Sequence, residues 1–190
     1  GASGRTGAAG ILPGKPGFSV DAMVNHINIL LWDIEIFIRD HKSTVLYRDV
    51  QGRSVQEYLL MILTFIDAWI LEPGGFPDYF MEARKKKRIA IFDYIRLISR
   101  GRTASGHIPF VSLMDYFYNV RKRTDKFLNT TGIEKLFAPV PGSPFQLLDS
   151  VMEARQYGIH YLVGIEKVLS GDREDIDSYE FSHPGFAVYK

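Results

Sequence analysis

Apolar residues recur with helical spacing along most of this 190-residue chain, and short stretches rich in Gly and Pro separate the runs. Apolar side chains every three to four residues are typical of amphipathic helices, and clusters of Gly and Pro end them. The pattern predicts five helices, at residues 19–40, 54–72, 78–100, 109–129 and 144–170. We therefore expect an all-α protein, a single helical bundle of about five helices.

Both ends of the chain lack this periodicity. Residues 1–18 contain six glycines and two prolines, which predicts a flexible N-terminal arm. Residues 171–190 begin acidic and end aromatic, which predicts a flexible C-terminal arm that docks without forming a helix. Residues 19–170 then form one helical core domain.

Two of the predicted helices, 19–40 and 54–72, are apolar nearly all the way round. Ser54 and Glu57 form a capping box at the start of the second. The stretch "DIEIFI" in the first also alternates like a strand. A helix that is apolar on every side is buried by its neighbours or by another subunit, so the pair forms a central hairpin or supports self-association.

The last two helices each carry an apolar stripe that predicts their core face. In helix 109–129 the predicted core residues are Phe110, Leu113, Met114, Phe117 and Leu128. In helix 144–170 they are Phe145, Leu148, Met152, Ile159 and Val163.

The net charge of +1 hides a strong segregation of charge. Residues 84–126 hold twelve Lys and Arg against three acids, a local charge of +9, so the rest of the chain carries −8. Residues 149–180 hold eight acids against three bases. Clustered like charges repel one another and favour oppositely charged partners.

The basic residues begin with "RKKKR", near the start of a predicted helix, where they oppose the helix dipole. Burying them would be costly, so we expect them in solvent. Exposed tyrosines beside basic residues bind nucleic acid by stacking on bases while the cations contact phosphates. The predicted nucleic-acid strip consists of Arg84, Lys85, Lys86, Lys87, Arg88, Arg96, Arg100, Arg102, Tyr116, Tyr118, Arg121, Lys122 and Arg123.

A second pattern bears on catalysis. Arg155 and His160, in "ARQYGIHYL", have the Arg-x4-His spacing, and Arg102 and His107 match it as well. The spacing is similar to the signature of HEPN-type ribonucleases, small helical proteins that pair their active sites across a dimer. The resemblance implies acid–base chemistry at His160 and charge stabilisation by Arg155.

We find no sequence motif for a metal site, a cofactor site or a membrane span. The chain has no cysteine and no histidine pair with metal-ligand spacing, so we expect no metal site and no cofactor. No apolar run reaches the about 20 residues that a membrane span needs. The N-terminus lacks the apolar region of a secretory signal, so we expect a soluble, intracellular or virion-associated protein.

Together these features predict a structural subunit that binds nucleic acid, RNA in preference to DNA, without sequence preference. We expect it to form homo-oligomers through its terminal arms, an organisation like that of viral nucleocapsid and filament coat proteins. A ribonuclease is one alternative. A module that binds an acidic protein or a lipid surface is another.

Overall fold

The computed structural model describes residues 20–41, 43–77 and 110–188. The helices are α1 (Val20–Asp40), α2 (Ser43–Leu46), α3 (Val55–Ile66), α6 (Phe110–Thr130), α7 (Ile133–Leu136) and α8 (Leu147–Leu169). A π-helical turn, η3 (Asp67–Leu71), continues α3, and a 3₁₀ helix, η4 (Pro184–Val188), lies near the C-terminus. Two short antiparallel strands, β1 (Asp49–Val50) and β2 (Arg53–Ser54), form a hairpin before α3.

This architecture confirms the all-α prediction, and the helices expected at 19–40, 54–72, 109–129 and 144–170 are present with small shifts at their ends. The helix expected at 78–100 and the arm expected at 1–18 lie outside the described residues. No helix in the described ranges is long and apolar enough to cross a membrane.

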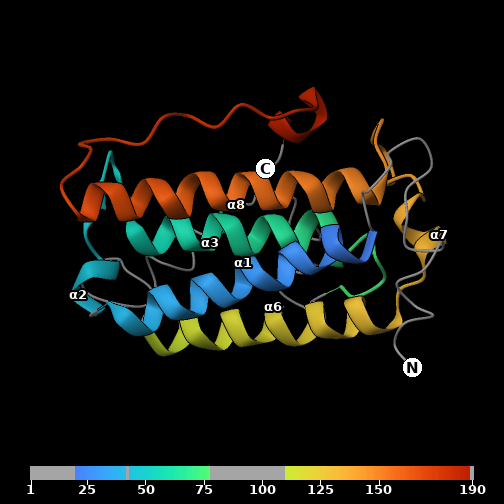
Figure 1. The fold of residues 1–190 in the computed structure, drawn as a ribbon, viewed down its shortest axis with the longest axis horizontal. Helices are drawn as coiled ribbons and strands as arrows, with labels where there is room; N and C mark the ends of the chain where they lie inside the picture. The colour runs from blue at the N-terminus through green and yellow to red at the C-terminus, as the bar shows by residue number, and fades with distance from the viewer. Residues whose placement is uncertain (1–19, 42, 78–109, 189–190) are drawn as a thin grey trace, which may run out of the picture.

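The four longest described helices pack side by side (Figure 1). Both α1 and α3 pack mainly against α8 and α6. In Figure 1, α8 runs along the top of the bundle, α6 along the bottom, and α1 between them. The two helices that are apolar all round therefore do not form one packed hairpin.

Helix α3 is the centre of the core. Eleven of its twelve residues are buried, which its apolar sequence on every face predicts. It begins as expected at Ser54, whose hydroxyl accepts a hydrogen bond from the Glu57 backbone N–H at 3.2 Å. This cap satisfies one of the N–H groups that a helix start leaves unpaired.

The core face of α8 matches the sequence-based prediction only near the start of the helix. Phe145, just before the helix, and Leu148 are 2% and 7% exposed, whereas Ile159 and Val163 are 42% and 40% exposed. Val151, Ala154 and Ile165 pack inward instead. The tertiary contacts with α1 and α3 select this face over the predicted one in the later turns of the helix. In α6, the buried positions Leu113 and Phe117 match the prediction, but Phe110 is exposed.

Beyond α8 the chain reverses and runs back along the outside of that helix (Figure 1). The segment is mostly extended until η4, and it packs through aromatic side chains such as Phe181 and Phe186. The C-terminal segment thus docks on the bundle, and its last described residues form the 3₁₀ helix η4, which the sequence does not predict.

Candidate interaction face on helix α1

Helix α1 is apolar on two opposite sides. Its inner side contains Ile27, Leu31, Ile34 and Ile38, each at most 2% exposed. Its outer side contains Ile29, Trp32 and Ile36, which are 49%, 55% and 41% exposed. We call these last three residues the α1 outer face. The inner side packs α1 into the bundle, and within the described residues the outer face keeps two-fifths or more of its surface exposed.

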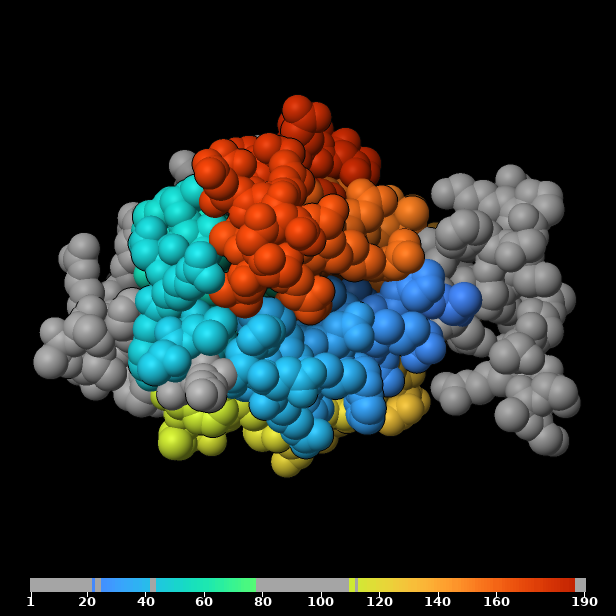
Figure 2. Space-filling view, turned by 60° about the vertical axis from the view of Figure 1, so that its left-hand side comes forward, coloured from blue at the N-terminus to red at the C-terminus, as the bar shows by residue number. Residues whose placement is uncertain are grey.

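The spacing of the α1 outer face places its side chains in one line. Ile29, Trp32 and Ile36 stand at positions i, i+3 and i+7, which share one side of a helix. Figure 2 shows α1 as a band of surface between α8 and α6.

A buried carboxylate, Glu35, fixes the position of α1 against α6. Its side chain is 7% exposed and forms ion pairs with Arg121 of α6 and with Arg39, the latter at 2.6 Å. The guanidinium of Arg121 also lies 5.7 Å from the centroid of the Trp32 ring. A cation over an indole face is attracted by the ring electrons, so Trp32 is held in an outward position.

Most of the predicted nucleic-acid strip cannot be located. Eight of its residues lie outside the described part of the chain: Arg84, Lys85, Lys86, Lys87, Arg88, Arg96, Arg100 and Arg102. The remaining five are on α6, where their surroundings can be compared with the expectation of an exposed strip.

Arg123 and Tyr116 point into the bundle. The Arg123 guanidinium donates to both carboxylate oxygens of Asp67 at 2.7 and 2.8 Å and to the Phe76 carbonyl at 3.0 Å. The Tyr116 hydroxyl donates to the same carboxylate at 2.9 Å. Asp67 is completely buried and Arg123 is 12% exposed. Tyr116 and Arg123 therefore do not form the exposed Tyr–Arg pair that the sequence predicts, because both donate hydrogen bonds to the buried carboxylate of Asp67.

Arg121 is likewise occupied, by Glu35 and Trp32. Tyr118 is 44% exposed and Lys122 is exposed, as expected for a strip that faces solvent. Of the five strip residues that the structure describes, Tyr118 and Lys122 are thus the two that are exposed as predicted.

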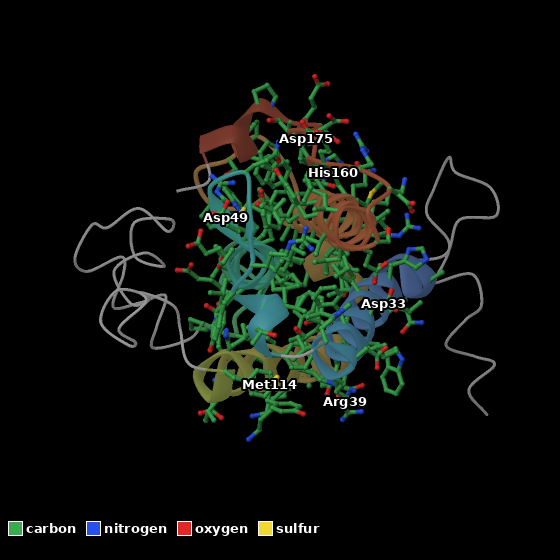
Figure 3. The ribbon with its side chains drawn as sticks, turned by 90° about the vertical axis from the view of Figure 1, so that its left-hand side faces the viewer. Asp33, Arg39, Asp49, Met114, His160 and Asp175 are labelled. Atoms are coloured by element: carbon green, nitrogen blue, oxygen red, sulfur yellow. The ribbon has the colours of Figure 1, made fainter. Side chains whose placement is uncertain are left out.

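The candidate catalytic pair on α8 does not converge. His160 is five positions after Arg155, which places the two residues about 140° apart around the helix axis. His160 lies beneath the segment that carries Asp175 (Figure 3), and its Nε2 is 2.6 Å from the Asp177 carbonyl oxygen. Arg155 is exposed. His107 lies outside the described residues, and no group of three His, Asp or Glu within them could hold a metal ion.

The sequence shows that helix α1 is apolar on every side, but it does not show which side stays exposed. Ile29, Trp32 and Ile36 are spaced like core residues, and so are the residues of the opposite side. Which apolar side of α1 is buried depends on how the neighbouring helices pack against it. Comparison of the chain with protein-family models, with curated proteins and with solved structures finds no match.

Proposed function

We propose that this chain is a non-enzymatic structural subunit that associates with a second copy of itself through the α1 outer face. The observation that carries the proposal is that Ile29, Trp32 and Ile36 are each more than two-fifths exposed on a helix whose opposite side already fills the core. An exposed apolar patch of this kind marks an interaction surface.

The order of residues along α1 supports a second copy as the partner. Ile29 and Ile36 lie symmetrically about the point between Trp32 and Asp33. Two antiparallel α1 helices related by a two-fold axis at this point would each place Ile29 against Ile36 of the other. The same arrangement brings each Trp32 indole N–H beside an Asp33 carboxylate. A two-fold interface requires this kind of self-complementary surface.

A charge-reversal experiment tests both the surface and the register. Ile29→Lys alone and Ile36→Glu alone each bury an unpaired charge, so we expect each to weaken the dimer at least about tenfold, equivalent to about 1.4 kcal/mol. The double variant Ile29→Lys/Ile36→Glu pairs opposite charges at both contacts and restores association. Light scattering and sedimentation measure the outcome.

Val111→Lys is the matched control, because it makes the same kind of change at an exposed position of α6. It should leave the dimer unchanged. A wild-type chain that is monomeric at high micromolar concentration would contradict the proposal. Failure of the double variant to recover association would reject the antiparallel register.

A second function, nucleic-acid binding, is supported by the charge of residues 84–126 and by the exposed pair Tyr118 and Lys122. Neutralising Lys85, Lys86 and Lys87 together should weaken RNA binding, with a smaller salt dependence, because fewer counterions are released. Neutralising Lys135 and Lys167, exposed lysines elsewhere on the surface, is the control. Equal RNA affinity in both variants would exclude the basic strip.

A further inference from the structure

A polar cavity lies where the β1–β2 hairpin, α3, α8 and the C-terminal segment, residues 172–188, come together. In Figure 1 the hairpin stands at the end of α8 where the chain reverses. The cavity has a volume of about 430 Å³, which is within the range of cavities that hold small molecules. None of its lining residues belongs to α1, so it is separate from the α1 outer face.

The tip of the hairpin forms one wall of the cavity and is fixed by side-chain hydrogen bonds. Gln51 has a φ of +57°, which is uncommon for a residue other than glycine and persists where the surroundings fix it. Its Oε1 accepts a hydrogen bond from the Ile176 N–H at 3.0 Å. The Gly52 N–H donates to Asp49 Oδ1 at 3.0 Å. Because the Gln51 amide uses its oxygen to hold the C-terminal segment, its NH₂ group is the part that can bind a ligand.

Two tyrosines on the inner wall differ in what their hydroxyls do. The rings of Tyr58 in α3 and Tyr161 in α8 are 5.5 Å apart. The Tyr58 hydroxyl donates to the Val50 carbonyl at 2.9 Å. Tyr161 is 9% exposed, and its hydroxyl has no hydrogen-bond partner among the described residues. A hydroxyl in such a place is costly unless something in the cavity pairs with it, so Tyr161 offers a donor to an occupant.

Arg53 brings a positive charge to the cavity wall. Its Nη1 lies 3.6 Å from the Met61 sulfur, which is a weak acceptor. Burial raises the pKa of Tyr58 and the charge of Arg53 lowers it, so that charge acts on the inner wall. The acid in the lining, Asp177, is paired with Arg173 at 2.9 Å, which offsets its negative charge. A guanidinium binds carboxylate and phosphate groups through two parallel hydrogen bonds.

We propose that this cavity binds a small molecule through an oxyanion, either a carboxylate or a phosphate group. Arg53 binds the oxyanion, and the hydroxyls of Tyr161 and Ser178 donate to it from α8 and from the C-terminal segment. The Gln51 NH₂ group donates from the hairpin. An oxyanion only accepts hydrogen bonds, so it matches a wall on which the available groups are donors. The proposal does not depend on self-association through α1.

Titration with inorganic phosphate and, separately, with acetate tests the site by NMR. The side-chain N–H resonances of Gln51 and Arg53 report on the cavity itself. We expect one or both anions to shift these resonances saturably, with a dissociation constant of about 10 mM or lower. The tighter of the two identifies the group that the cavity prefers. Sodium chloride at the same ionic strength is the control for screening.

Tyr161→Phe and Tyr58→Phe form a matched pair, because each removes one hydroxyl from the same cavity. Tyr161→Phe should weaken anion binding at least about fivefold without lowering the urea midpoint of the free protein, since its hydroxyl has no partner among the described residues. Tyr58→Phe should lower the urea midpoint, because the Val50 carbonyl loses its donor, while the affinity stays within about twofold. Arg53→Gln should weaken binding at least about tenfold.

Resonances of Gln51 and Arg53 that do not move at about 100 mM of either anion would overturn the proposal. So would Arg53→Gln or Tyr161→Phe variants that remain folded by circular dichroism and bind the anions as tightly as the wild type. Ile29→Lys changes a residue outside the cavity and should leave the affinity unchanged. Binding that persists in this variant while the dimer is lost separates the cavity from the proposed function.

Discussion

The ion pair between Asp67 and Arg123 gives the most demanding test of how this bundle is held together. Asp67 is completely buried at the first position of η3, and its carboxylate receives two hydrogen bonds from Arg123 and one from Tyr116. Arg123 also holds the Phe76 carbonyl, so the cluster joins α6 to η3 and to the loop that follows. Replacing Arg123 with Met removes three of these four bonds and leaves a buried carboxylate with one donor.

Removing one partner of a buried ion pair costs about 3–5 kcal/mol, because the remaining charge is desolvated and uncompensated. A domain of this size has a total stability of about 5–15 kcal/mol, so Arg123→Met should lower the free energy of unfolding by about a fifth or more. Asp67→Leu should cost less, since the Arg123 side chain is long enough to carry its charge toward solvent. The double variant Asp67→Leu/Arg123→Met removes both charges and should recover most of the loss.

Urea unfolding followed by far-ultraviolet circular dichroism gives these free energies from the midpoint and slope. The comparison of the single and double variants isolates the coupling between the two side chains. An Arg123→Met variant that loses less than about 1 kcal/mol would refute the assignment of the cluster as a buried, desolvated pair. So would a double variant as unstable as the single one.

Three further perturbations follow from individual contacts. Gly158→Ala should destabilise the protein by about 1–3 kcal/mol in thermal or urea unfolding, although alanine has the better helix propensity, because the new Cβ would lie 2.4 Å from Leu30 Cδ2. The double variant Gly158→Ala/Leu30→Ala should lose less stability than the two single variants added together. Ser54→Ala should cost about 1 kcal/mol in urea unfolding, since it removes the N-cap of α3, whereas Ser54→Asp should retain most of the stability. Burial raises the pKa of Tyr157 and of Tyr179 above the ordinary value of 10.0, so their stabilising contribution is complete below pH 10 and is lost as the pH rises further. For the more deeply buried Tyr157 the loss is up to about 1.4 kcal/mol per pH unit, so Tyr157→Phe should flatten a plot of urea midpoint against alkaline pH.

The sequence predicts the helices because their signals are local. The periodic apolar residues of α1 and α6, the cap at Ser54 and the Gly and Pro stretches that end helices act over a few neighbouring residues. These signals can be recognised without knowledge of the tertiary structure. With η3 counted as the end of α3, the helix ends in the described ranges lie within three residues of the predicted ends.

The sequence pattern does not predict which side chains contact each other across the bundle. Arg123 looks like one member of a basic strip, but its carboxylate lies 56 residues earlier in the chain. Ile159 and Val163 have the spacing of a core stripe, yet α8 turns another stripe inward. In α1, both sides are apolar, and the exposure of Trp32 depends on how many helices surround it. Each case is decided by tertiary contacts that spacing does not encode.

The two tryptophans of the chain occupy contrasting places, and each can serve as an intrinsic optical probe. Trp32 is 55% exposed on α1, while the Trp69 ring lies edge-on against Phe186, with centroids 5.2 Å apart. A Trp32→Phe variant leaves emission from Trp69 alone, which reports whether the C-terminal segment is seated. A Trp69→Phe variant leaves Trp32, whose emission shifts to shorter wavelength when its surface becomes dry. Fluorescence without any added label can thus follow subunit contact and segment docking as separate events in time.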